Sequence, residues 1–123
     1  MNRFEAALTA LALAIAGTTA AQAGSYTADR ALQEYEEALK LEPNVDNGRE
    51  LFRKCTICHL PEGWGTESGS YPQIAGQLNT VIIKQLADIR ARNRDVPTMY
   101  PFSDRSTVGN AQDDFGISVA ISG

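Results

Sequence analysis

The feature that most constrains this chain is the run Cys55-Thr56-Ile57-Cys58-His59, which holds both cysteines and the only histidine of the sequence. Two cysteines at this spacing lie about one helical turn apart, so their sulfurs can face the same side of a short helix. His59 follows directly, and its ring can turn toward that side. A fold for this chain must therefore bring two thiols and an imidazole together.

Several kinds of site use such a cysteine pair. A thioredoxin-type dithiol belongs with a βαβ pattern, and no strand pattern is visible. A zinc site needs four ligands, and the chain has no further Cys or His. A simple disulfide between the two cysteines, as in many exported proteins, remains an alternative interpretation. The C-x-x-C-H sequence is the signature of covalent haem attachment. We therefore expect one haem c, bonded through Cys55 and Cys58 to two vinyl groups, with its iron held by His59.

A second axial ligand for the iron is expected at Met99, the only methionine besides Met1. Most single methionines fill cores. Here Pro97 and Pro101 flank the residue, which predicts extended backbone and favours a residue held in a loop. Thioether ligation raises the reduction potential of the iron relative to bis-histidine ligation, which the single histidine excludes within this chain.

Residues 1–23 have the pattern of a cleavable signal peptide. Met1-Asn2-Arg3 is a short basic start, residues 6–16 are uncharged and apolar, and Ala21-Gln22-Ala23 offers a cleavage site. The apolar run is too short to span a bilayer, which takes roughly 20 apolar residues. We therefore expect export to the periplasm, with no stable membrane span after cleavage.

The size and charge of the mature chain limit its function further. It is one small domain, and such domains often need a disulfide, a metal or a cofactor to complete the core. The formal net charge is −4 and the pI is about 4.9. No basic stripe is present, so nucleic-acid binding is not expected. An acidic surface favours basic protein partners.

The rest of the chain is predicted to be all-α, because its apolar residues recur at helical spacing. After a flexible leader at 24–30, helices are expected over 28–41, from Asp46 or Asn47 to Cys55, over 74–92, and from about 112–114 to Gly123, with a loop over 60–73 and extended chain over 95–104. The third helix carries a broad stripe at helical spacing, formed by Leu78, Val81, Ile82, Gln85, Leu86 and Ile89. The last helix ends without a cap pattern, and we expect the native chain to continue beyond it.

These residues together resemble class I c-type cytochromes, from about Asn47 to the end. The run GRELF before the CTICH motif resembles the N-terminal helix of that fold. The runs YPQIAGQ and KQLADIR are similar to the bacterial periplasmic branch that often carries two haem domains in tandem. The resemblance implies helices packed around one covalently attached haem in residues 46–123. Residues 24–45 then form an N-terminal extension with an extra helix.

The resemblance also implies roles for residues outside the motif. In class I folds a proline about a dozen residues after the haem histidine offers its carbonyl to the histidine Nδ1–H, a role that falls to Pro72. Trp64 and Tyr71 are expected to pack on the haem or line its pocket. Three arginines are candidates to pair with the haem propionates, although a solvated helix end explains them as well: Arg90, Arg92 and Arg94.

The chain also departs from the family pattern. Leu60 stands where the family commonly has glycine after the haem histidine, and the last helix looks short. Both departures concern places where the backbone of the fold is tightly constrained. We therefore expect them to show in the structure.

The function we expect is single-electron transfer in the periplasm, by a protein that is not itself an enzyme and that exchanges electrons with redox protein partners. The alternative is a haem domain or subunit of a larger periplasmic oxidoreductase complex, with a second haem domain or subunit as partner. Two other classes stay open. One is a haem sensor, in which Met99 is absent from the iron or readily displaced, and the other is a haem-free binding module closed by a disulfide.

Overall fold

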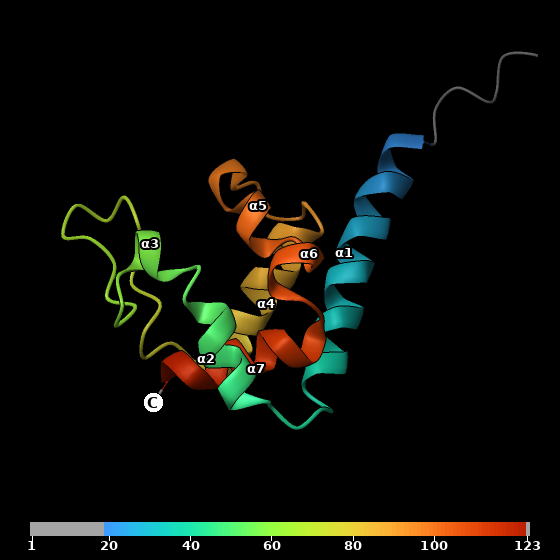
Figure 1. Cartoon of the computed structure of the whole chain (residues 1–123). Helices are drawn as coiled ribbons and strands as arrows, with labels where there is room; N and C mark the ends of the chain where they lie inside the picture. The colour runs from blue at the N-terminus through green and yellow to red at the C-terminus, as the bar shows by residue number, and fades with distance from the viewer. Residues whose placement is uncertain (1–18, 123) are drawn as a thin grey trace, which may run out of the picture.

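The computed structural model describes the backbone of residues 19–122 and the side chains of residues 27–121, so most of the predicted signal peptide lies outside the described residues. The described chain is all-helical, as expected (Figure 1). Its elements are α1 (Thr19–Ala38), α2 (Val45–Phe52), α3 (Thr56–His59), α4 (Asn79–Arg90), the 3₁₀ turn η1 (Pro97–Met99), α5 (Tyr100–Ser103), α6 (Arg105–Val108) and α7 (Ala111–Ser122). Among the helices of this described part, none combines the length and the apolar character that a membrane crossing needs.

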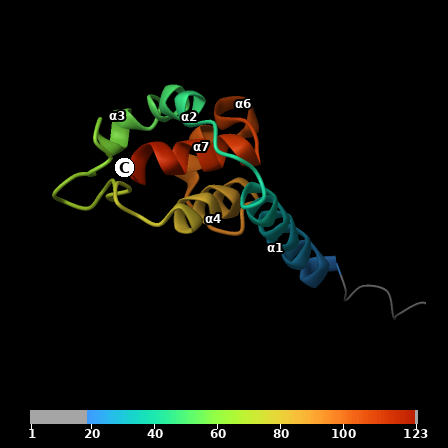
Figure 2. The same cartoon turned by 90° about the horizontal axis from the view of Figure 1, so that it is seen from below.

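Helix α7 runs through the middle of the molecule, with α2 on one side and α4 on the other (Figure 2). Two glycines let α2 and α7 touch through their backbones. A Cβ on Gly48 would lie 2.2 Å from the carbonyl carbon of Gly116, and a Cβ on Gly116 would lie 2.4 Å from the carbonyl oxygen of Asn44. The last helix is therefore long enough to pack against α2, although its sequence looks short.

The apolar core lies where α2, α4 and α7 meet. Its buried members are Phe52, Ile82, Leu86, Val108, Ile117 and Ile121. A smaller cluster of Ala38, Ile83 and Ala111 joins α1 to α4 and α7. The helix of the N-terminal extension is thus packed on the rest of the fold. Two members of the predicted α4 stripe are not in the core, because Leu78 is 72% exposed and Val81 is 39% exposed.

Helix α1 is present but differs from the predicted range of 28–41. It begins at Thr19 and ends at Ala38, so the segment 24–30 that we expected to be a flexible leader is helical. Residues 24–30 contain no proline, and Ala31 just beyond them is only 3% exposed, which fixes the helix on the core. Once one part of a helix is packed, the helix extends easily through neighbouring residues that do not break helical structure.

Two predicted helix starts are corrected by cap geometry. Helix α2 is capped by Asn44, whose side chain accepts from the Asn47 N–H at 3.1 Å, and not by Asp46 or Asn47. Helix α4 begins at Asn79 and not at Ile74. Gly76 has a φ of +74°, which a helix cannot contain, and the N–H of Ile74 donates to the Gly63 carbonyl at 2.8 Å. Residues 74–78 therefore belong to the long loop.

The segment 95–104 is not extended, contrary to expectation. It forms η1 followed directly by α5, with Pro97 and Pro101 near the start of these two short helices. Proline is tolerated in the first turn of a helix because its φ is already helical and the missing N–H would have no partner there. The two prolines thus begin short helices on either side of Met99.

Candidate haem-binding site

The single turn of α3 carries the cysteine and histidine motif. Cys55 is its N-cap residue, and the His59 N–H donates to the Cys55 carbonyl at 2.9 Å. This turn places Cys55, Cys58 and His59 along one cavity, as the spacing predicts. The two thiols are not joined in a disulfide. Burial raises the pKa of the Cys55 thiol to about 11, so at neutral pH this thiol is protonated.

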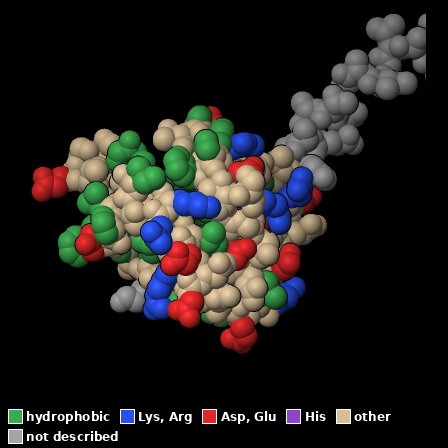
Figure 3. All heavy atoms as spheres, viewed as in Figure 1, with side chains coloured by type: hydrophobic (Ala, Val, Ile, Leu, Met, Phe, Trp, Pro, Cys, Tyr) green, Lys and Arg blue, Asp and Glu red, His purple; other side chains and the backbone are tan. Residues whose placement is uncertain are grey.

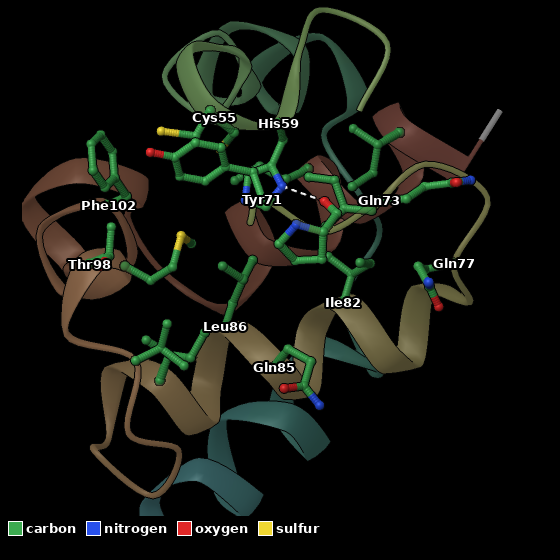
Figure 4. A pocket seen from close by; sticks show the side chains of 18 of the residues that line it. Cys55, His59, Tyr71, Gln73, Gln77, Ile82, Gln85, Leu86, Thr98 and Phe102 are labelled. Atoms are coloured by element: carbon green, nitrogen blue, oxygen red, sulfur yellow. Dashed lines mark hydrogen bonds between the residues drawn. The ribbon is translucent and has the colours of Figure 1, made fainter. Parts of the chain in front are cut away.

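The cavity beside α3 has a volume of about 590 Å³, within the range of about 300–1,000 Å³ that is typical of cofactor sites. In Figure 4, Cys55 and His59 lie on one side of it and Ile82, Gln85 and Leu86 of α4 lie on the other. Thr98 and Phe102 close a third side. Its apolar lining is completed by Ile74, Val81, Ile89, Ile117 and Ile121. Three walls of the cavity thus come from segments far apart in the sequence.

His59 is held in one orientation by the loop that follows it. The ring is 6% exposed, and its Nδ1 lies 2.7 Å from the carbonyl oxygen of Pro72 (Figure 4). A carbonyl only accepts, so Nδ1 carries a hydrogen, and in the neutral ring Nε2 then keeps its lone pair. This is the contact that the resemblance implies for Pro72. The geometry leaves one nitrogen of His59 able to bind a metal.

A glycine that sequence analysis did not single out brings Pro72 to His59. Gly65 has a φ of +71°, and its N–H donates to the His59 carbonyl at 3.0 Å. A Cβ on Gly65 would lie 2.4 Å from the Tyr71 carbonyl oxygen. The chain can therefore fold back on itself only because this residue has no side chain.

Met99 lines the same cavity as the motif, at the end of η1 and half-buried. Tyr71 lines it as well and is 38% exposed. Trp64 is placed differently from our expectation. It is 64% exposed and lines a separate hollow with Phe52 and Ala120, outside the main cavity. The structure thus brings Met99, Tyr71 and Pro72 to the site and leaves Trp64 out of it.

The three candidate arginines have three different environments. Arg90 does not line the cavity and is buried in ion pairs with Glu34 and Asp114. Arg92 stacks on the ring of Tyr100, with its guanidinium carbon 3.3 Å from the ring centroid. Arg94 lines the cavity and donates to the Gln85 side chain. Only Arg94 is thus placed to meet a charged group at the cavity.

The sequence did not predict that several other residues line the cavity, namely Lys54, Gln73, Gln77, Gln85, Thr98 and Phe102. The three glutamines belong to the runs YPQIAGQ and KQLADIR, so the resemblance pointed to these segments without assigning the side chains. Phe102 follows Pro101, and only the short helix α5 turns it into the cavity.

The donor set and the lining of the cavity fit a haem. Two thiols at one turn of helix suit covalent attachment, while an imidazole and a thioether are common axial ligands of haem iron. The mostly apolar walls suit a large planar cofactor, and the polar side chains Gln73, Gln77, Gln85 and Arg94 suit its charged edge. The residues present therefore fit the group that the motif predicts.

Comparison with known proteins finds a similarity to cytochromes c4. Cytochrome c4 from Azotobacter vinelandii is 38% identical over 90 residues, which cover 64% of this chain and 42% of that protein. Cytochrome c4 from Pseudomonas aeruginosa is 38% identical over 63 residues, covering 43% and 31%. Cytochrome c4 from Stutzerimonas stutzeri is 37% identical over 81 residues, covering 65% and 37%. The chain thus matches less than half the length of each of these curated relatives.

No family model matches the chain, and no solved structure matches it significantly. The similarity therefore depends on the curated relatives, together with the helical fold and the Cys55, Cys58 and His59 site. On these grounds the chain is similar to part of cytochrome c4, and its all-helical fold with the Cys55, Cys58 and His59 site is consistent with a class I cytochrome c fold.

Proposed function

We propose that this protein is a periplasmic single-electron carrier with one haem c, bonded through Cys55 and Cys58 and ligated by His59 and Met99. One observation carries the proposal: these four side chains line a single cavity, although Met99 lies far from the others in sequence. A bound haem supplies an iron that gains and loses one electron. The chain itself attaches the group, orients its ligands and limits access of water.

The two residues that would ligate the iron, His59 and Met99, are held with different stiffness. His59 is buried and bonded to Pro72, so its ring is fixed before any metal arrives. Met99 is half-buried at the end of a single 3₁₀ turn, between two prolines that restrict the backbone. A thioether ligand favours the reduced iron and raises the potential. With both residues bound to the iron in both oxidation states, electron transfer would need little rearrangement of the chain.

The walls of the cavity support a carrier more than an enzyme. Ile82, Leu86 and Ile89 are at most 9% exposed and form an apolar floor on α4. Such a floor would exclude water from a bound iron, while the polar side of the cavity would leave a route for electrons to redox protein partners. The periplasmic location is supported by the signal-peptide pattern of residues 1–23.

A second candidate is a haem domain or subunit of a larger oxidoreductase complex. The observation that favours it is the match to less than half of each curated relative. The size of the native gene product, or a tightly bound protein that purifies with it, distinguishes this from a free carrier. A second haem on the native product would support it directly.

Covalent attachment is tested by a pyridine haemochrome spectrum combined with intact mass, after expression in a host with haem-attachment machinery. We expect one covalent haem per chain. The double variant Cys55→Ala with Cys58→Ala should retain none, because no thiol remains to hold the porphyrin. A wild-type protein without a Soret band would instead indicate the haem-free disulfide module.

Ligation by Met99 is tested with the variant Met99→Ala. We expect loss of the far-red band of ferric Met–haem coordination, a lower reduction potential and carbon monoxide binding to the ferrous form. Thr98→Ala is the matched control, because Thr98 lines the same cavity without a thioether and should leave the band unchanged. If the band persists without Met99, another residue is the ligand. Rapid and complete binding of carbon monoxide by the wild type would favour a haem sensor.

A further inference from the structure

Arg90, at the end of α4, connects three other elements through one side chain. It is 9% exposed although it always carries a charge. Its Nε donates to the Ser103 carbonyl at 2.6 Å, and its Nη1 and Nη2 donate to the two carboxylate oxygens of Asp114 at 2.9 Å each. Nη1 also donates to the Glu34 carboxylate. Each guanidinium nitrogen is therefore in use.

The contact with Ser103 fixes the segment that carries Met99. Ser103 is fully buried and ends α5, which follows Met99 directly. The carbonyl that Arg90 holds is thus one helical turn beyond the methionine. A second tie comes from the Thr107 hydroxyl, which donates to the Pro101 carbonyl at 2.7 Å. Two hydrogen bonds therefore help to hold the segment that carries Met99, and the one from Arg90 of α4 is charge-assisted.

The partners of Arg90 include a residue of the N-terminal extension. Glu34 lies on α1 and its side chain is 8% exposed, while that of Asp114 on α7 is fully buried. Arg105 contacts Glu34 at 3.3 Å, so the cluster holds two positive and two negative side chains. Removing one partner of a buried ion pair leaves a charge without compensation. Glu34 thereby links α1 to the side chain that holds α5.

We propose that Arg90 is a positioning residue for Met99, and that Glu34 makes the N-terminal helix part of this device. The proposal depends on the proposed function, since it requires Met99 to bind the iron. When Arg90 releases Ser103, α5 and Met99 move more freely, and an added ligand replaces the thioether more easily. Helix α1 is then an element that determines how firmly the methionine is held.

Imidazole titration of the ferric holoprotein tests this, with the far-red Met–haem band and the reduction potential as readouts. Arg90→Lys keeps the charge but loses the Nε donor and the planar fork. We expect its apparent affinity for imidazole to rise about tenfold, which corresponds to 1.4 kcal/mol, and its potential to fall. Glu34→Gln should shift both in the same direction by a smaller amount. If Arg90→Lys does not fold, Glu34→Gln decides the question alone.

Two controls on α1 separate positioning from general stability. Glu37→Gln makes the same change on an exposed residue and should leave both readouts at the wild-type values. Ala31→Gly, at a buried position outside the charge cluster, weakens the helix by about 1 kcal/mol but keeps the ion pairs of Glu34, so it should change imidazole affinity less than Glu34→Gln does.

The proposal is overturned if Arg90→Lys and Glu34→Gln lower stability but leave imidazole affinity and potential unchanged, or if Ala31→Gly raises the affinity equally. A wild-type ferric protein without the far-red band overturns this proposal and the His59 and Met99 ligation together. A wild type with the band and unresponsive variants contradicts the positioning role alone.

Discussion

Leu60, directly after His59, has a backbone conformation that side chains rarely adopt. Its φ is +68° and its ψ is 160°, a region that is essentially restricted to glycine. The side chain gains little in return, because it is 38% exposed. The family commonly has glycine at this position, and the structure gives the reason: the chain must turn sharply here so that the loop can return to His59 with Pro72.

Leu60→Gly is therefore expected to stabilise the protein. Relief of the strain amounts to about 1–3 kcal/mol, from which the greater freedom of glycine in the unfolded chain subtracts about 0.5–1 kcal/mol. We expect a net gain of about 1 kcal/mol in the free energy of unfolding, measured by urea denaturation of the holoprotein. Leu60→Ala removes the side chain but keeps the strained backbone, so it should show no such gain. Equal changes in the free energy of unfolding for the two variants would show that the backbone at Leu60 is not strained.

At the scale of elements, the crossing of α2 and α7 depends on the absence of two side chains. The backbones meet at Gly48 and Gly116, where no Cβ fits. The start of α7 is fixed by a reciprocal cap at Asn110 and Asp113. The Asn110 side chain accepts from the Gln112 N–H at 2.8 Å, and the Asp113 carboxylate accepts from the Asn110 N–H at 2.8 Å. This cap sets where α7 begins and therefore which glycine meets α2.

Gly48→Ala discriminates between helix propensity and contact. Helix propensity alone predicts that the free energy of unfolding rises by about 1 kcal/mol, because alanine is a better helix former than glycine. The added Cβ would lie 2.2 Å from the backbone of α7, and overpacking of this kind costs about 1–3 kcal/mol or more. We expect a net loss of stability, visible as a lower midpoint of urea unfolding. A stabilised variant would show that the two helices do not approach so closely.

At the scale of the whole molecule, a buried ion-pair cluster holds α1, α4 and α7 together. Asp114 is fully buried against Arg90, and burial raises the pKa of its carboxyl to about 6 in spite of that partner. The carboxyl is thus mostly charged at pH 7 and mostly neutral at pH 5. Titration of one residue therefore changes the charge balance at the junction of three helices.

The pH dependence of stability follows from this raised pKa. In the unfolded chain the carboxyl titrates near 3.8, so between about pH 4 and pH 6 the folded state binds more protons. Its contribution is then complete below pH 4 and is lost as the pH rises through 6. Relative to Asp114→Asn, the wild type should lose on the order of 3 kcal/mol of unfolding free energy between pH 4 and pH 7. Urea denaturation of both proteins across this range measures it. Parallel pH curves would contradict the raised pKa.

Much of the site could be predicted because its chemistry is local. The spacing of Cys55, Cys58 and His59 places three side chains on one helical turn, whatever surrounds that turn. The all-helical character also follows from local apolar periodicity. The ligand role of Met99 remains a prediction. The structure adds that Met99 shares a cavity with the motif, but places it on short helices and not in an extended segment.

The features that sequence analysis placed wrongly depend on contacts between distant segments. The start of α4 at Asn79 could not be predicted from the sequence, because it depends on hydrogen bonds from residues before it to the distant Gly63. The different environments of Arg90 and Arg94 could not be predicted either, because they depend on the ion-pair partners of Arg90 on α1 and α7. The sequence by itself predicted the residues that would attach and ligate a haem, because residue type and short spacing carry that chemistry. Only the tertiary structure decided which side chains surround them, because burial and pairing arise when helices far apart in the chain pack together.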